Sequence, residues 1–433
     1  TSEVVDDNAG QFSMVMVNDP MPEGLYIKLI YEGGGEAGGS GSISAEVDLL
    51  TNLFGYGEPN SGQVGGSATD VVLADLGSSS RSIDGFDDVI VTTTDSIFVF
   101  LSDGSGGFST QVELTDTAFS SLAAVSAGDL DGDGTIDLVV VNSITNEFIP
   151  IFNPSQNISE LSVGDAVSTG PFPTDVLAIN TDNDGDADVI VVCYGYSFSD
   201  GQIDFFESVP SVTGLFMISG SLPSPGNPGK INPGDVNTDK DIKVYISFGS
   251  SNSAGAAGQS SAVRGFNWQY ETMVNVATGP TDIVIGDINN DSIDDIVVAC
   301  PESDVLTLLT GQSDGSFSNP LYLFVGDEPT SIQLLDFDND GDKDIAVVAT
   351  NPETQLRAVM MYRNDTSNNG GNLMFANDAQ YDEGMNPILV AKGDIDGDNH
   401  DDLISITQAS SFRGTTTEVQ FRQSDAEASC PAD

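Results

Sequence analysis

The chain has 433 residues, of which 39% are hydrophobic, so it contains enough apolar side chains for a large folded core. It carries 67 acidic and 12 basic residues, and a formal net charge of −55 repels both nucleic acid and anionic membrane surfaces. We therefore expect no nucleic-acid partner. No apolar run reaches about 18 residues, so we also expect no membrane insertion.

The N-terminal region contains two strand-like segments, FSMVMVN at 12–18 and LYIKLIY at 25–31. Their apolar residues are bounded by Gly, Pro, Asn and Asp, a pattern that favours strands. We therefore expect an N-terminal arm or hairpin over 1–42. It either packs on the side of the main domain or extends to a neighbouring subunit by strand addition, and the sequence leaves both open.

From residue 75 onward, a short acidic motif recurs at intervals of about 50 residues. Its seven copies begin at Asp75, Asp129, Asn180, Asp235, Asp287, Asp336 and Asp394. An apolar run precedes each copy, a β-branched run such as DLVVVN usually follows, and two more strand-like segments come before the next copy. Because no window shows a convincing helical stripe, the pattern predicts an all-β fold. Seven repeats of four strands predict a seven-bladed β-propeller of four-stranded antiparallel blades.

The last repeat supplies three strands, at 387–393, 402–408 and 417–422. The fourth must come from elsewhere, and ISAEVDLL at 43–50 precedes the first repeat. Pairing the two ends would remove exposed sheet edges. We therefore predict a propeller over 43–422, closed by this N-terminal strand, and a C-terminal tail over 423–433.

The clearest copy of the motif places oxygen-bearing residues alternately along a tight turn, at Asp129, Asp131, Asp133, Thr135 and Asp137. Positions 1, 3, 5 and 9 offer side-chain oxygens and position 7 a backbone carbonyl, which suits Ca²⁺ and its preference for about six to eight oxygen ligands. Without an ion, the crowded carboxylates would repel one another. An EF-hand is excluded because Val140 stands where that loop needs a glutamate and because strands, not helices, follow.

Four further copies keep this spacing. Their predicted ligands are Asn180, Asp182, Asp184, Asp186 and Asp188; Asp287, Asn289, Asp291, Ile293 and Asp295; Asp336, Asp338, Asp340, Asp342 and Asp344; and Asp394, Asp396, Asp398, His400 and Asp402. The first copy keeps Asp75, Asp84 and Asp88 around an insertion. The fourth copy has Lys243 at position 9, where the amine would replace the ion. We expect Ca²⁺ as the cofactor, about five to six ions in all.

Five segments carry a family resemblance: GDLDGDGTIDLVVV at 128–141, NTDNDGDADVIVV at 180–192, GDINNDSIDDIVV at 286–298, DFDNDGDKDIAVV at 336–348 and GDIDGDNHDDLIS at 393–405. They resemble the FG-GAP/VCBS repeat family, which includes the propeller of integrin α subunits, and the resemblance covers 70–422. It implies a seven-bladed propeller with calcium in the loop that joins the first two strands of a blade. It also implies a role in adhesion, ligand binding or surface assembly.

The loops between second and third strands should lie on the face opposite the calcium loops, if the strands of a blade run from inside to outside. Aromatic and basic residues in those loops are the types that anchor interfaces and stack on sugars. The candidate ligand contacts are Tyr194, Tyr196, Phe198 and Arg413.

We expect a secreted or cell-surface, calcium-stabilised adhesion or recognition module that binds a protein or a glycan. One alternative is a subunit of a surface filament or coat, a homo-oligomer assembled through the N-terminal arm; another is a secreted polysaccharide-active enzyme. The one histidine, His400, lies in a calcium loop, so we expect no enzyme. Cys193 and Cys300 lie in strand-like runs and predict buried free thiols, whereas Cys430 could pair with another chain.

Overall fold

The computed structural model describes residues 60–422 with gaps at 78–83, 106, 155–156, 197–199, 210–213, 225, 235–242, 249–252, 260–267, 368–372, 382–384 and 412–413. It also describes the backbone of four strands nearer the N-terminus, β1 (Glu3–Asp7), β2 (Gln11–Met16), β3 (Leu25–Glu32) and β4 (Ser42–Leu49). The regular secondary structure of the described residues is almost entirely β-strand, and its helical segments include only short 3₁₀ turns such as η1 (Ile158–Glu160) and η3 (Pro301–Ser303). Within these residues, no helix has the length and apolar character that crossing a bilayer requires.

The first propeller sheet shows how the sequence forms a blade. It consists of β6 (Ala68–Ala74), β7 (Asp88–Thr93), β8 (Ile97–Ser102) and β9 (Phe108–Leu114), paired in that order and antiparallel. Every residue of β7 is buried, whereas residues of the outermost strand β9 are half-buried or exposed. The second strand therefore needs a continuous β-branched run, because neighbouring blades cover it on both faces.

Five more sheets repeat this order of four consecutive antiparallel strands. Their strands are β10 (Leu122–Gly128), β11 (Asp137–Asn142), β12 (Glu147–Phe152) and β13 (Ser162–Val163), with β14 (Val167–Ser168) also on β12; β15 (Pro173–Ile179), β16 (Asp188–Cys193), β17 (Gln202–Ser208) and β18 (Phe216–Pro223); β19 (Pro228–Gly234), β20 (Lys243–Phe248), β21 (Ser253–Gln259) and β22 (Trp268–Asn275); β23 (Asp282–Gly286), β24 (Asp295–Cys300), β25 (Val305–Leu309) and β26 (Leu321–Phe324); and β27 (Asp327–Leu335), β28 (Asp344–Thr350), β29 (Arg357–Asn364) and β30 (Phe375–Tyr381).

One propeller sheet joins the two ends of the described propeller. It pairs β31 (Pro387–Gly393), β32 (Asp402–Ser411) and β33 (Gly414–Arg422) with β5 (Asn60–Gly65), and Val419 lies opposite Gly62. The prediction that 43–50 supplies this strand is wrong, because β4 pairs with β3 in a separate sheet of order β1-β2-β3-β4. The alternating apolar residues of 43–50 suggested the closing strand, while the glycine-rich SGQVGG did not look like one.

Gly62 explains why a glycine-rich segment is used at this position. A Cβ atom on Gly62 would lie 2.4 Å from Cε1 of Phe100, a buried residue of the first blade. The strand can therefore approach the neighbouring blade only where this side chain is missing.

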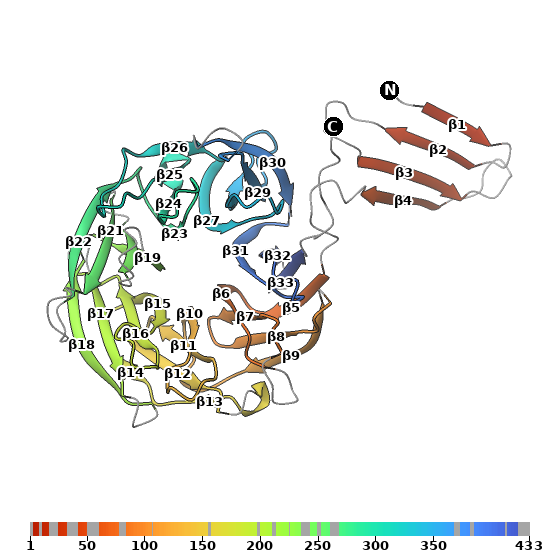
Figure 1. Ribbon diagram of the computed structural model, residues 1–433. Coiled ribbons are helices and arrows are strands. Elements are labelled where there is room, and N and C mark those ends of the chain that lie inside the picture. The colour runs from red at the N-terminus through yellow and green to blue at the C-terminus, as the bar shows by residue number, and fades with distance from the viewer. Residues whose placement is uncertain are drawn as a thin grey trace.

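The innermost strands contact one another around a central axis (Figure 1). In order, β6 contacts β10, β10 contacts β15, β15 contacts β19, β19 contacts β23, β23 contacts β27, β27 contacts β31, and β31 contacts β6. The fold is thus an all-β propeller of four-stranded antiparallel blades.

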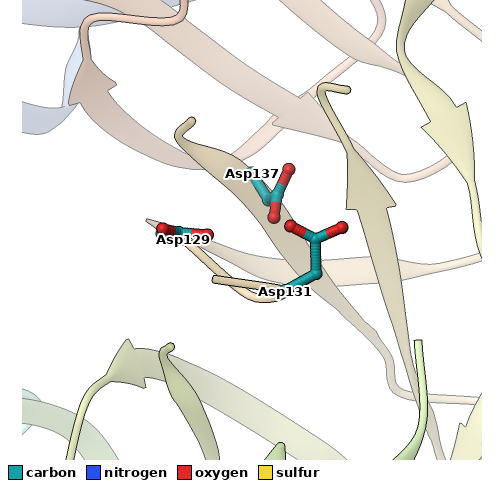
Figure 2. A group of neighbouring side chains, drawn as sticks. All are labelled: Asp129, Asp131 and Asp137. Atoms are coloured by element: carbon teal, nitrogen blue, oxygen red, sulfur yellow. The ribbon is translucent and has the colours of Figure 1, made fainter. Parts of the chain in front are cut away.

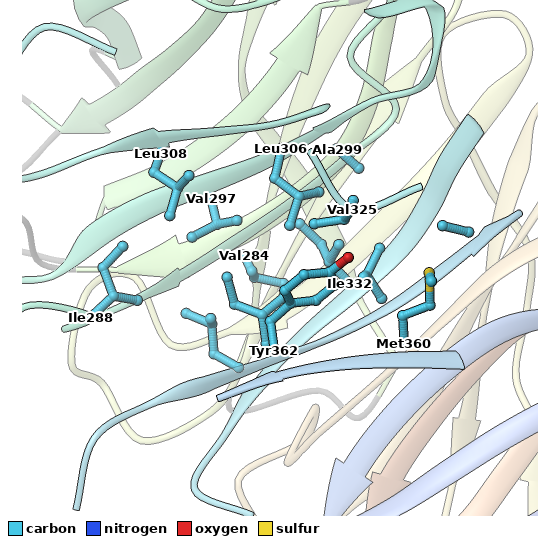
Figure 3. Close-up of a cluster of buried hydrophobic side chains, with 14 of the residues drawn as sticks. Val284, Ile288, Val297, Ala299, Leu306, Leu308, Val325, Ile332, Met360 and Tyr362 are labelled. Atoms are coloured by element: carbon cyan, nitrogen blue, oxygen red, sulfur yellow. The ribbon is translucent and has the colours of Figure 1, made fainter. Parts of the chain in front are cut away.

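The hydrophobic core is divided into clusters that lie between neighbouring blades. Figure 3 shows one of them, in which Val297 and Leu306 pack with Ile332 and Met360 of the following blade. Burying such side chains contributes about 25 cal/mol per Å² of apolar area, so most of the stability of a blade depends on its neighbours. Cys193 and Cys300 belong to these clusters as free thiols, as predicted, whereas Cys430 lies outside the described residues.

The N-terminal strands β2 and β3 pair with each other, with Val15 opposite Lys28. They are part of the four-stranded sheet β1-β2-β3-β4 rather than an isolated hairpin. The pairings among the described strands do not join this sheet to a propeller blade. Its role as a packed element or an assembly arm therefore stays a prediction.

Candidate metal centres

The predicted acidic loops join the innermost strand of a sheet to its second strand. In the clearest copy, β10 ends at Gly128, Asp129 follows at once, and Asp137 is the first residue of β11. The other copies whose loops the structure describes have the same placement, with position 1 after the first strand and position 9 at the start of the second. The spacing in the sequence therefore places every loop on the same face of the propeller.

Position 1 orders the loop by accepting hydrogen bonds from its backbone. The carboxylate of Asp129 accepts from the N–H groups of Gly132 at 2.8 Å, Asp133 at 3.1 Å and Gly134 at 2.9 Å. Gly134, at position 6, has a φ of 85°, a left-handed conformation that glycine adopts without strain. The turn brings position 3 back towards position 1.

Position 9 is a buried aspartate that accepts hydrogen bonds from its own loop and from the residue after the third strand of its blade. Asp137 is 1% exposed; its Oδ2 accepts from the N–H of Leu130 at 2.9 Å and its Oδ1 from the N–H of Asn153 at 2.7 Å. Burial raises the pKa of Asp137 to about 7, and Asp131 and Asp133 add to the rise. In Asp344, burial raises the pKa to about 8. A nearby positive charge would favour the ionised form of both carboxyls.

Three loops bring the carboxylates of positions 1, 3 and 9 together, each with one oxygen within 4.8 Å of the others. The groups are Asp129, Asp131 and Asp137 (Figure 2); Asp336, Asp338 and Asp344; and Asp394, Asp396 and Asp402. Because the same three positions meet in separate blades, we expect the three groups to have the same role. The loops at 180–188 and 287–295 have asparagine at position 1 or 3, so they lack three acids at these positions.

Asp338 offers an independent sign that an ion fits. Its Oδ1 atom is buried and has no hydrogen-bond partner among the described residues. Burial, together with the charges of Asp340 and Asp336, raises the pKa of Asp338 to about 6. A buried carboxylate oxygen without a donor is costly unless a cation or a proton compensates it.

Position 5 accepts a hydrogen bond from the backbone of its own loop. Oδ1 of Asp291 accepts from the N–H of Ile293 at 2.9 Å, and Oδ1 of Asp398 accepts from the N–H of His400 at the same distance. Asp133, Asp184 and Asp340 accept in the same way from the residue two positions on. These carboxylates thus turn onto their own loop, and their role as ligands stays a prediction.

Position 7 makes contacts that the sequence did not indicate. Thr135 donates its hydroxyl to the carbonyl of Asn153 at 2.8 Å. Asp342 accepts from the N–H of Ser367 at 2.8 Å and also binds the side chain of Asn290 from the preceding blade. Asp342 therefore helps to join the loops of adjacent blades, which no local pattern reveals.

The two damaged loops differ from each other. Asp75 accepts from the N–H groups of Gly77 and Gly85, and Asp88 is buried and accepts from Leu76 and Ser102, so positions 1 and 9 keep their usual contacts. Asp84 accepts from the N–H of Phe86 at 3.4 Å. In the fourth loop, Lys243 is buried at the start of β20, while Asp235, Asn237 and Asp239 lie outside the described residues.

Two of the candidate ligand contacts, Tyr194 and Tyr196, lie in the loop between β16 and β17, on the face opposite the metal loops. Tyr194 is 37% exposed and Tyr196 is 72% exposed; Phe198 and Arg413 lie outside the described residues. Phe172, which precedes β15, packs edge-on against Tyr196 with ring centroids 5.3 Å apart and is itself 42% exposed.

Phe172 was missed by the sequence analysis, although its signal, an aromatic residue between two prolines, is visible in PFP at 171–173. It has a φ of 53°, which is unusual for a bulky residue. Its carbonyl accepts from the N–H of Tyr194 at 2.9 Å, so the loops that carry the two rings are joined.

A family model described as FG-GAP-like repeat matches residues 84–140 and 287–347. Together with the arrangement of the blades, it confirms the resemblance to FG-GAP propellers. No curated protein matches the chain.

Solved structures resemble the fold at low identity. One is the crystal structure of BBS1N in complex with ARL6DN, soaked with lead, which is 15% identical, with 87% of this chain and 99% of that chain covered and a TM-score of 0.53. Another is a functionally unknown protein from Desulfotomaculum acetoxidans DSM 771, 15% identical, with 75% and 92% covered and a TM-score of 0.50. These likenesses show the fold alone.

Proposed function

Because this chain carries FG-GAP-like repeats within a β-propeller, we propose that it is a secreted or cell-surface recognition module, stabilised by calcium, that binds a protein or a glycan without catalysing a reaction. In this proposal the ring has seven blades, the composite sheet of β5 and β31–β33 being the last. The observation that carries it is the recurrence of the three-carboxylate groups in separate blades.

Calcium suits these groups better than other common ions. The ligand atoms are carboxylate and backbone oxygens on flexible loops, with no cysteine and, at position 7 of one loop, a single histidine. When bound, the ion would supply positive charge to the carboxylates of Asp129, Asp131 and Asp137 and their counterparts. The residues themselves hold the two inner strands of a blade at a fixed separation through position 9.

We expect calcium to occupy the loops that keep their predicted ligand residues. We infer calcium in the five intact loops and in the first loop, where Asp75 and Asp88 keep their contacts. The fourth loop should remain free of calcium because Lys243 supplies a positive charge at position 9, where the other loops have an aspartate. The residual negative charge of the chain remains large and favours a solvated surface.

We propose that the ligand binds to the face that carries the exposed aromatic side chains. Phe172, Tyr194 and Tyr196 present ring surface on the face opposite the loops, and Asn227 donates an amide hydrogen bond to the Tyr194 hydroxyl. Exposed aromatic rings with neighbouring amides suit both sugar stacking and protein hot spots.

Chelation tests the calcium part of the proposal. Dialysis against EDTA should lower the melting temperature by several degrees, and Ca²⁺ added in excess over the chelator should restore it, because an ion that binds only the folded state stabilises by mass action. An equal ionic strength of NaCl serves as the control. Equal melting temperatures with and without chelator would refute calcium stabilisation.

The ligand part is tested separately on an array of neutral and acidic oligosaccharides and by adhesion of the purified chain to cells. Tyr196→Ala and Phe172→Ala should lower binding at least tenfold, since each removes an exposed ring. Tyr322→Ala, an exposed tyrosine on the outer strand β26, is the matched control. Equal binding by all three variants would rule out this face.

A second function is favoured by the N-terminal sheet β1-β2-β3-β4, whose strands pair among themselves. The chain would then be a filament or coat subunit that assembles through this sheet. Concentration-dependent assembly that is lost on deleting 1–50 would favour this function over a monomeric recognition module.

A further inference from the structure

A cavity of about 330 Å³ lies on the axis of the ring, lined by residues of the innermost strands. Its ionisable residues are Asp70 of β6, Asp175 of β15, Lys230 of β19 and Asp282 of β23. They come from four different blades and lie far from the metal loops, towards the other end of their strands. Three carboxylates thus surround a single amine.

Lys230 of β19 pairs with aspartates of two other blades, the neighbouring blade of β15 and the more distant blade of β6. Its Nζ lies 2.9 Å from Oδ1 of Asp70 and 3.2 Å from Oδ1 of Asp175. The side chain of Asp175 is 6% exposed and that of Asp70 is 10% exposed, so both carboxylates are largely removed from water, whereas the side chain of Lys230 is 31% exposed. These partners are 160 and 55 residues away along the chain.

The second oxygen of each aspartate holds the next blade. In each case Oδ2 accepts a main-chain N–H from the innermost strand of the following blade: Asp70 from Val125 at 3.1 Å, Asp175 from Ile231 at 2.7 Å, and Asp282 from Ile332 at 2.9 Å. Ser126 and Ser331 make the same kind of bond with their hydroxyl oxygens, to Ala178 and Val390. These hydrogen bonds hold the three carboxylates in position independently of Lys230.

The charge at the axis is unbalanced. Burial raises the pKa of Asp175 and of Asp282 to about 6, and the charge of Lys230 partly opposes both rises. The pKa of Lys230 is also raised, because the attraction of Asp175 and Asp70 outweighs its burial. A carboxyl whose pKa is higher in the folded than in the unfolded chain lowers stability as the pH rises from the unfolded value of 3.8 to the folded value of about 6, and the loss is complete above about pH 6.

We propose that Lys230 is a built-in cation that locks the ring at its axis, joining Asp70, Asp175 and Asp282 as an ion would join its ligands. The innermost strands of neighbouring blades converge here, so one amine holds several blades at once. The axis is then a charged core of the fold and not a passage for the ligand.

Lys230→Met tests this lock, because methionine keeps much of the length of the side chain and removes its charge. With calcium in excess at pH 8, the variant should melt roughly 5 °C or more below the natural chain, since breaking a buried ion pair strands the remaining charges. The gap should narrow as the pH falls from 8 to 5, because protons then neutralise Asp175 and Asp282 in place of the amine. A gap of equal size at both pH values would show that Lys230 acts only by packing and would overturn the proposal.

Two further variants separate the loss of the Lys230 charge from a general loss of stability. Lys230→Met combined with Asp70→Asn and Asp175→Asn should recover most of the lost melting temperature at pH 8, and it provides a readout if the single variant does not fold. Lys392→Met is the matched control, because Lys392 of β31 pairs with Asp401 at 2.9 Å and its side chain is 31% exposed, as is that of Lys230, while Asp401 keeps Lys343 as a second partner. No recovery in the triple variant, or a loss as large in the control, would also contradict the lock.

Discussion

The aspartate at position 9 is the residue on which each metal loop depends. It is buried at the start of the second strand, and its two oxygens accept from the loop and from the end of the third strand. The sequence predicted positions 1, 3 and 9, because an alternation of acids within one short turn brings them together wherever the turn forms. It did not predict that position 5 would turn onto its own loop, since that depends on the exact backbone conformation.

Asp137→Asn tests the role of position 9. The amide keeps one acceptor oxygen but places an N–H₂ group against a backbone donor, so the variant should lose about 2 kcal/mol of unfolding free energy. It should also show a smaller rise in melting temperature on adding Ca²⁺, measured by calorimetry. Asp314→Asn, at an exposed position in the loop between β25 and β26 that is not one of the predicted ligands, is the control. A calcium response equal to that of the natural chain would argue against Asp137 as a ligand.

At the scale of elements, local sequence patterns predict the strands of each blade but not the strand that closes the ring. The β-branched second strands were recognisable because both faces of these strands are covered. The strand β5 was not, because Gly62 is required by the approach of Phe100 and glycine has a low strand propensity.

Gly62→Ala tests this explanation. The new methyl group would overlap the buried ring of Phe100, so we expect a loss of about 1–3 kcal/mol from overpacking, measured by denaturant unfolding. Gly65→Ala is the control on the same strand, because its Cβ would lie an ordinary 3.7 Å from Phe98. If both variants were equally stable, close packing at Gly62 would not be the reason for the glycine.

At the scale of the whole molecule, the ring is closed by a sheet built from both ends of the propeller. A hydrophobic cluster crosses this junction, in which Val64 of β5 and Val419 of β33 pack with Phe100 of the first blade. The closing sheet therefore protects an interface that would otherwise be exposed.

Two truncations test the closure. Deleting 1–50 removes β1–β4 and should leave the melting temperature nearly unchanged, whereas deleting 1–66 also removes β5 and should lower it markedly by exposing the cluster around Val64. Thermal unfolding and hydrodynamic radius measure the two outcomes. The same behaviour in both truncations would contradict the assignment of β5 as the closing strand.

The sequence by itself determined the repeat, the four-strand blades and the acidic loops, because each depends on residues that are neighbours in the chain. Only the tertiary structure decided which N-terminal strand closes the ring and which charges meet at its axis. Val419 and Gly62, like Lys230 and Asp70, are far apart in sequence, and it is the circular packing of the blades that brings them together.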